Sequence, residues 1–142
     1  MGDILAEPCR EIWVCDFVPT YDLFIRRVFV FFIIELGSRR VIHFGVTRSP
    51  SGFWVAQQVR EATPYEERPR FLIRDNDSKY GHCFTRVTED RQIEELRTPV
   101  QAPKANAVCE RFIGSVQREC LNHSIILGER HLRRRVREYR VR

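Results

Sequence analysis

The segment 24–36, FIRRVFVFFIIEL, constrains the fold more than any other part of the sequence. It is rich in β-branched and aromatic residues, and its apolar residues follow one another without alternation. A strand with one face in water alternates apolar and polar residues, so this run predicts a central strand covered on both faces. Its longest uninterrupted apolar stretch has seven residues, whereas a membrane helix needs roughly 20. We therefore expect a sheet with helices on both sides, and no membrane partner.

The rest of the chain predicts an α/β order around this strand. Further strands are predicted over 11–17, 39–46, 69–75 and 92–99. Helices are predicted over 52–62, after the start signal Ser49-Pro50-Ser51, and over 79–90, about 105–122 and 129–142. Three strands followed by alternating helices and strands indicate an antiparallel start with parallel additions. We expect a lead-in segment 1–10 and one α/β domain over 11–142, with a mixed five-stranded sheet and helices on both its faces.

Acidic residues stand where two of these strands end. Asp16 lies near the end of the first predicted strand, and Asp75 ends the fourth, within FLIRDNDSKYG. Ligands of open α/β sheets gather at strand ends, and a helical crossover permits these two strands to be neighbours. Two carboxylates placed side by side repel each other, and a divalent cation such as Mg²⁺ removes the conflict. This predicts a metal site at the ends of these strands.

A third acid comes from the long predicted helix 105–122. Glu110 falls at one edge of its apolar stripe, and Glu119 falls on the opposite side. Glu110 can therefore point along the sheet towards the other acids. Taken by itself, it fits better as one half of a surface pair with an arginine.

The residues around these acids resemble the catalytic cores of retroviral-type integrases and insertion-sequence transposases. The run Pro103-x-x-Asn106-x-x-x-Glu110-Arg111 is the most specific part of the resemblance, which covers about residues 11–140. The matching stretches are WVCDF at 13–17, LIRDNDSKY at 72–80, TPVQAPKANAVCERFIGSVQREC at 98–120 and GERHLRRRVREY at 128–139. The resemblance implies a ribonuclease-H-like fold and a DDE catalytic triad that holds two divalent cations, Mg²⁺ or Mn²⁺.

Residue by residue, the resemblance implies that Asp16, Asp75 and Glu110 are the three catalytic metal ligands. Asp77 stands where family members often have glycine, so it is interpreted either as a turn residue or as an alternative ligand. The implied reactions are DNA integration or transposition: water first cuts at an element end, and the freed 3′-OH then attacks target DNA. Two cations about 3.5–4 Å apart suffice for such phosphoryl transfer, without a serine or cysteine nucleophile.

Five positions are candidate DNA contacts, and each is equally compatible with a solvated surface residue: Lys104, Asn106, Arg111, Arg133 and Arg137. The last two lie in the basic helix 129–142, where Leu132, Val136 and Tyr139 form a narrow apolar stripe. A net charge of +5 and a pI of about 9.2 are compatible with a polyanionic partner. The implied partner is double-stranded DNA, both element ends and target. The chain would form a homo-oligomer on it, because joining two ends requires two active sites.

A different interpretation makes the chain a catalytically inactive, truncated transposase remnant that binds DNA or other subunits. Related transposases usually carry a DNA-recognition domain before the core, and only the segment 1–10 precedes the first strand here. The enzyme interpretation therefore implies a separate DNA-recognition domain. The five cysteines form no CxxC pair, which argues against a secreted disulfide framework and predicts reduced thiols in a cytoplasmic protein.

Overall fold

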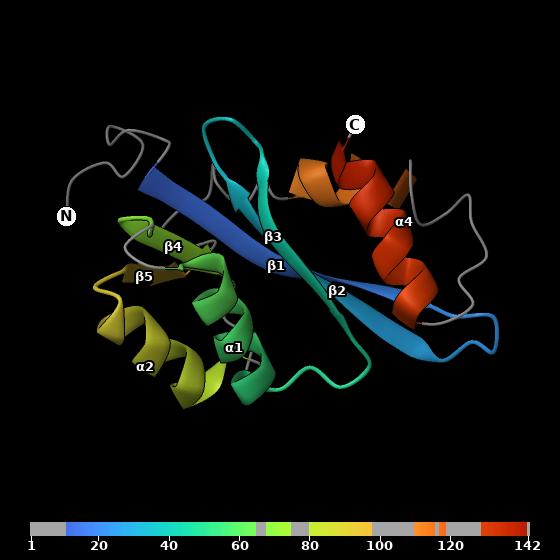
Figure 1. The fold of residues 1–142 in the computed structure, drawn as a ribbon, viewed down its shortest axis with the longest axis horizontal. Coiled ribbons are helices and arrows are strands. Elements are labelled where there is room, and N and C mark those ends of the chain that lie inside the picture. The colour runs from blue at the N-terminus through green and yellow to red at the C-terminus, as the bar shows by residue number, and fades with distance from the viewer. Residues whose placement is uncertain are drawn as a thin grey trace.

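The computed structural model describes residues 11–64, 68–74, 80–97, 110–115, 117–118 and 129–141. Within them, one five-stranded sheet has the strand order β3-β2-β1-β4-β5. The strands are β1 (Ile12–Tyr21), β2 (Arg27–Glu35), β3 (Val41–Thr47), β4 (Phe71–Arg74) and β5 (Glu94–Arg97). The labelled helices are α1 (Gly52–Ala62), α2 (Gly81–Asp90) and α4 (Glu129–Val141), and residues 110–115 are also helical. Figure 1 shows their arrangement.

The sheet is mixed, as predicted. β1 pairs antiparallel with β2, and β2 pairs antiparallel with β3. On its other side β1 pairs in parallel with β4, and β4 pairs in parallel with β5. The predicted neighbourhood of the first and fourth strands is therefore confirmed, and β1 is the central strand of the sheet.

β2 lies between β1 and β3, and its residues 30–34 are buried without interruption. Phe31 and Ile33 contribute to the core under α1 and α2, while Phe32 and Ile34 contribute to the cores of the opposite face. This confirms the prediction of a strand covered on both faces. The strand begins at Arg27, later than the predicted residue 24, because the chain turns between β1 and β2.

The first face of the sheet carries α1 and α2, which lie side by side in Figure 1. Trp13 and Cys15 of β1 pack there with Val55 of α1 and Phe84 of α2. The start signal of α1 is confirmed: the side chain of Ser51 accepts a hydrogen bond from the backbone N–H of Trp54 at 3.2 Å. A serine in this position satisfies a backbone donor that the first helical turn leaves unpaired.

The second face carries α4 and the helical segment 110–115. Leu132 and Val136 of α4 are fully buried against the sheet, which confirms the predicted apolar stripe at these two residues. Phe112 and Ile113 pack against the same face from the segment 110–115. Residues 105–109, 116 and 119–122 of the predicted helix 105–122 lie outside the described part of the chain, as does the side chain of Tyr139. No described helix is long and apolar enough to span a membrane.

The turn between β1 and β2 is organised by the carboxylate of Asp22. β1 continues to Tyr21, beyond the predicted end at residue 17, because it pairs with β2 over its whole length. Asp22 is buried and accepts hydrogen bonds from the backbone N–H groups of Phe24 and Arg26, each at 2.9 Å. Its other oxygen pairs with the guanidinium groups of Arg26 at 3.0 Å and Arg48 at 2.9 Å. These contacts are called the Asp22 network below.

Asp22→Asn is expected to destabilise the protein in a pH-dependent way. Burial alone would raise the pKa of Asp22, but the hydrogen bonds from Arg26, Arg48 and Phe24 outweigh it and lower that pKa. A carboxyl with a lowered pKa in the folded state stabilises the protein above its unfolded pKa, and this contribution is lost as the pH falls through the folded pKa. Urea midpoints of wild type and variant should therefore differ at neutral pH and converge in acid. Asp90→Asn, at the exposed end of α2, is the control, and a pH-independent gap for Asp22→Asn would contradict the expectation.

Candidate active site

Asp16 lies in the middle of β1 and is half-buried. Along this strand Trp13, Cys15 and Phe17 pack on the first face, whereas Ile12, Val14 and Val18 pack on the second. Side chains of a strand alternate between its two faces, so Asp16 belongs to the second face. Its Oδ1 accepts a hydrogen bond from the N–H of Phe17 at 2.7 Å, which restricts the carboxylate. Asp16 therefore places a carboxylate on a face where its neighbours along the strand, Val14 and Val18, are apolar.

The segment that begins with Glu110 packs on this same face. The residue directly opposite Asp16 on β2 is Phe32. The rings of Phe32 and Phe112 meet edge to face with their centroids 5.4 Å apart. Glu110 is exposed, and the described part of its helix runs from it to Ser115. Ile113, which shares its side of a helix, packs against the sheet. The structure therefore places Asp16 and the helical turn of Glu110 on one face, with one aromatic contact between them.

Asp75 and Asp77 lie outside the described residues, and β4 is described up to Arg74. Among the described residues, no three His, Cys, Asp or Glu side chains are grouped closely enough to hold a metal ion. This finding leaves the predicted triad untested, because one of its three members is not described. Lys104 and Asn106 also lie outside the described part of the chain.

A buried ion pair beside the end of β4 escaped the sequence analysis. Arg74 is only 4% exposed, and its guanidinium pairs with the carboxylate of Glu95 on β5. The same guanidinium lies over the rings of Tyr80 and Phe84, 4.9 and 5.5 Å from their centroids. The hydroxyl of Thr85 donates to the other oxygen of Glu95 at 3.2 Å. The pair thus joins β4, β5 and α2 directly before Asp75.

The arginine itself was the available signal for this pair. A charged residue inside a buried strand needs a partner, because an unpaired buried charge is very costly. The stretch FLIRD displays such a residue. The identity of the partner was not available, because Glu95 is 21 residues away and meets Arg74 only through the parallel pairing of β4 with β5.

Comparison with solved structures finds a similar fold in retroviral integrases. The catalytic core domain of BIV integrase superposes with a TM-score of 0.61 at 17% identity, covering 89% of this chain and 81% of that one. The HTLV-2 integrase catalytic core domain in complex with magnesium, in its trimeric form, gives 0.58 at 12% identity, covering 89% and 82%. A chain of the simian T-cell lymphotropic virus intasome in complex with PP2A regulatory subunit B56 gamma gives 0.65 at 16% identity.

The fold is that of a retroviral integrase catalytic core. This ribonuclease-H-like fold confirms the fold implied by the sequence resemblance. The match to the intasome chain covers 76% of this chain but only 38% of that chain, so this chain corresponds to a part of that protein. No protein-family model and no curated protein matches the sequence. At these identities the similarity establishes the integrase core fold alone.

Three of the candidate DNA contacts can be placed on the integrase core fold. Arg111, next to Glu110, is exposed, and so are Arg133 and Arg137 on the outer side of α4. The exposure agrees with the prediction that the arginines of α4 point away from the sheet. It is compatible both with phosphate contacts and with ordinary solvation.

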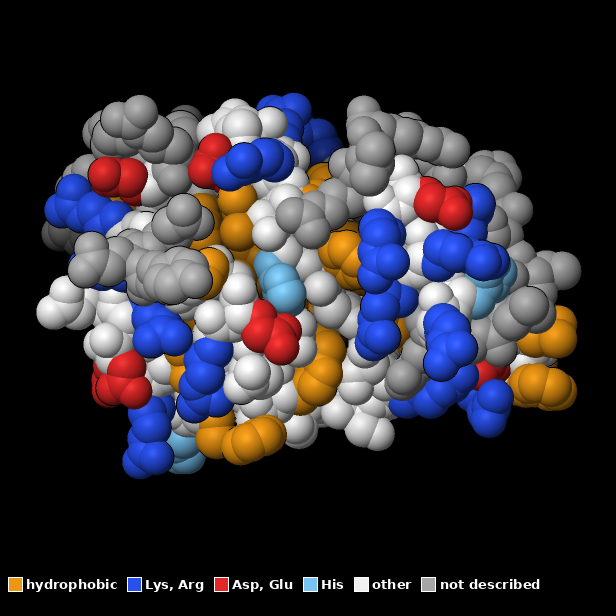
Figure 2. Space-filling model, viewed as in Figure 1, with side chains coloured by type: hydrophobic (Ala, Val, Ile, Leu, Met, Phe, Trp, Pro, Cys, Tyr) orange, Lys and Arg blue, Asp and Glu red, His pale blue; other side chains and the backbone are white. Residues whose placement is uncertain are grey.

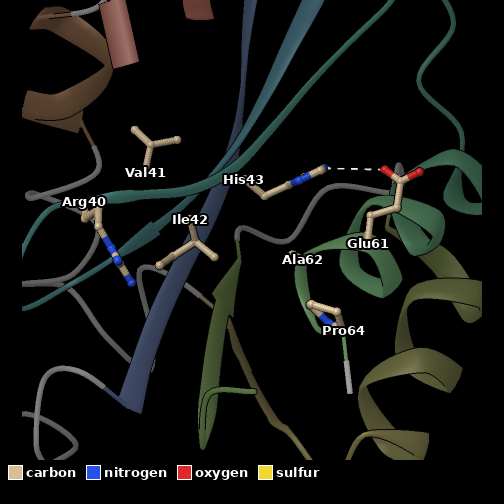
Figure 3. A pocket seen from close by; sticks show the side chains of 7 residues that line it. All are labelled: Arg40, Val41, Ile42, His43, Glu61, Ala62 and Pro64. Atoms are coloured by element: carbon tan, nitrogen blue, oxygen red, sulfur yellow. Dashed lines mark ion pairs between the residues drawn. The ribbon is translucent and has the colours of Figure 1, made fainter. Parts of the chain in front are cut away.

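A cavity of about 260 Å³ opens elsewhere in the integrase core fold, between β3 and the end of α1. Figure 3 shows His43 pointing towards Glu61 across it, with Nε2 and Oε2 3.7 Å apart. His43 Nε2 also lies 2.7 Å from the side-chain oxygen of Gln58. Gln58 reaches this position over Gly45, where a Cβ atom would lie 2.5 Å from its oxygen. These polar groups belong to the α1 side of the sheet, so the cavity is not the predicted acidic site.

Proposed function

We propose that this chain is the catalytic core of a DNA integrase or transposase that cuts and joins DNA by metal-dependent phosphoryl transfer. The observation that carries the proposal is the shared face of Asp16 and the helical turn of Glu110: Phe32, the strand partner of Asp16, contacts Phe112, two residues after Glu110. Acids distant in the chain gain nothing for folding by converging on one face of a sheet. A site for divalent cations gives a reason for it.

The register of the sheet supports Asp75 as the third ligand. In the parallel pairing of β1 with β4, Val14 is opposite Ile73. Asp16 and Asp75 each follow that pair by two residues in the sequence, so the same register continued beyond Arg74 would bring them to equivalent positions. A carboxylate two residues beyond Ile73 therefore suits a site shared with Asp16. Asp77 remains an alternative ligand or a turn residue in this proposal.

The donor set suits Mg²⁺ or Mn²⁺, since carboxylate oxygens are the ligands these hard cations prefer. Asp16, Asp75 and Glu110 would hold the cations, which when bound supply charge neutralisation at the phosphate and activate the attacking oxygen. Among the chain's own residues, the Phe17 N–H restricts the rotation of the Asp16 carboxylate. The pairing of Arg74 with Glu95 fixes the end of β4, and Phe112 seats the turn that bears Glu110.

The proposed partner is double-stranded DNA, held by exposed arginines such as Arg111, Arg133 and Arg137. Joining two element ends requires two active sites, so we propose a homo-oligomer on DNA that works with a separate DNA-recognition domain. The structures that share the fold include dimeric and trimeric integrase cores and an intasome. These structures support testing whether this chain also forms an oligomer.

The proposal is tested by metal-dependent nicking of a labelled DNA duplex. The wild-type chain is expected to nick in Mn²⁺ or Mg²⁺ and to stop when the cation is chelated. Asp75→Asn is expected to remove the activity, because a metal ligand is lost. DNA binding by a well-folded chain without nicking under either cation would favour the alternative, a catalytically inactive, truncated transposase remnant.

A further inference from the structure

Three large apolar side chains project from the turn between β1 and β2. Leu23, Phe24 and Ile25, called the apolar tip below, are 52%, 69% and 80% exposed. Single exposed hydrophobic residues are common on proteins, but consecutive ones at a protruding turn mark a contact surface. At the right-hand end of Figure 2, where Figure 1 places this turn, orange side chains project beyond the rest of the molecule.

The apolar tip is held rigidly rather than left mobile. The Asp22 network ties the backbone N–H of Phe24 and both the backbone and the guanidinium of Arg26 to one buried carboxylate. Ile25 has a φ of 60°, a left-handed conformation that is a genuine outlier for a β-branched residue. Such strain persists only where the surroundings impose it, and it is found at functional sites. Here it directs the side chain of Ile25 into solvent instead of into the core.

Arginines directly follow the apolar tip in the chain, and others lie on α4. The guanidinium of Arg26 lies over the ring of Phe24, 5.2 Å from its centroid, and that of Arg27 lies over Phe29. On the neighbouring α4, the exposed arginines are Arg130, Arg133, Arg134 and Arg137. Leu132 and Val136 of α4 belong to one hydrophobic cluster with Val28, at the beginning of β2. Figure 2 shows blue side chains gathered on the right-hand half of this face, where Figure 1 places α4.

The apolar tip lies further along the strand that bears Asp16, beyond the candidate active site in the direction of the strand's carboxyl end. Asp16 and the turn are on one strand, with Tyr21 as its last residue. Five residues of strand at about 3.3 Å each place the start of the turn about 17 Å beyond Asp16. The turn lies beyond Asp16 in the direction in which the parallel strands β1 and β4 both run. DNA bound along this end would meet both the acids and the apolar tip.

We propose that the apolar tip is a wedge that inserts Phe24 and Ile25 between stacked base pairs of bound DNA. This rests on the proposed function only in requiring that the chain bind DNA. Apolar wedges flanked by arginines unstack base steps in proteins that bend DNA, the arginines contacting the adjacent phosphates. A second copy of the chain is a poorer occupant, because symmetric pairing of two tips would bring their arginines together. A rigid tip suits a wedge, since an ordered side chain pays less conformational entropy on insertion.

The test uses a short DNA duplex in which one adenine is replaced by 2-aminopurine, whose fluorescence rises when it unstacks. A set of duplexes places this base at successive positions, in metal-free buffer so that no cutting occurs. The full chain is expected to raise the fluorescence at one position. Phe24→Ala combined with Ile25→Gly, where glycine accepts the positive φ freely, should abolish the rise and weaken binding by about tenfold. Phe53→Ala, which removes an equally exposed phenylalanine from α1, should change neither.

An undiminished rise in the double variant overturns the wedge, as does binding without any rise in fluorescence at any position. The wedge is equally overturned if the chain binds no DNA, or if the double variant loses only binding to anionic lipid vesicles or self-association in sedimentation. Nicking by wild type without unstacking contradicts the wedge alone. Unstacking that depends on the tip, in a chain that never nicks, contradicts the proposed catalytic function alone.

Discussion

Asp16→Asn is expected to remove metal-dependent DNA nicking and strand transfer while the fold stays intact. Asparagine keeps the size of the side chain and can still accept the hydrogen bond from the Phe17 N–H, which Asp16 accepts at 2.7 Å. It lacks the negative charge that a divalent cation requires of its ligand. Losing one group that stabilises a charged transition state costs at least about a hundredfold in rate. Initial rates of nicking in Mg²⁺ and in Mn²⁺ measure the effect.

A thermal-shift measurement separates loss of the metal from loss of another function. A cation that binds only the folded state raises the melting temperature, so Mg²⁺ should stabilise the wild-type chain. The same addition should have a much smaller effect on Asp16→Asn. Asp90→Asn, a matched change at the exposed end of α2 on the first face, should keep both the nicking rate and the Mg²⁺ response. Nicking at the wild-type rate by Asp16→Asn would remove Asp16 from the proposed site.

Glu95→Ala is expected to give the largest loss of stability, about 3–5 kcal/mol in the free energy of unfolding. Truncation leaves the guanidinium of Arg74, 4% exposed between β4, β5 and α2, without the carboxylate that neutralises it. The rings of Tyr80 and Phe84 hold it there and supply only part of the lost interaction. Because Asp75 directly follows Arg74, the variant should also lose nicking activity under conditions where it is still folded. Urea unfolding followed by circular dichroism measures the first effect.

The matched control is Glu138→Ala, which removes a carboxylate 53% exposed and 3.1 Å from Arg135 on α4. Surface pairs of this kind contribute at most about 1 kcal/mol, so the urea midpoint should barely move. The double variant Arg74→Met with Glu95→Leu should recover most of the stability, because apolar side chains can replace a buried pair. Equal losses for Glu95→Ala and Glu138→Ala would show that the buried pair contributes no more than a surface one.

Asp22 and Arg74 show two different uses of a buried charge in this fold. The carboxylate of Asp22 orders a turn whose apolar side chains remain in solvent. The guanidinium of Arg74 fixes the end of a strand inside the core. Asp22 directly follows β1, which contains the candidate ligand Asp16. Arg74 is the last residue of β4, and the candidate ligand Asp75 follows it in the sequence. Their variants therefore test how firmly the ends of these two strands must be held for activity.

Local pattern was enough to predict most of the elements. The uninterrupted apolar run of β2 and the start signal of α1 at Ser51 both act over a few residues, so they are legible without the fold. The predicted boundaries were wrong where long-range pairing extends a strand. An example is β1, which pairs with β2 as far as Tyr21. Phe24 and Ile25 were assigned to a strand for a different reason: both have strand-forming side chains, and only the Asp22 network places them in a turn.

The order of the strands and helices, the burial of β2 on both of its faces and the presence of Asp16 on a strand were determined by the sequence alone, whereas the place of Asp16 in the middle of that strand was not. They follow from periodicity, which each segment carries in itself. The tertiary structure decided which residues meet: Phe112 against the strand partner of Asp16, Glu95 against Arg74, and Asp22 against Arg48. These contacts depend on strand register and on the packing of distant segments, and the energy of such pairings is not contained in either partner's local sequence.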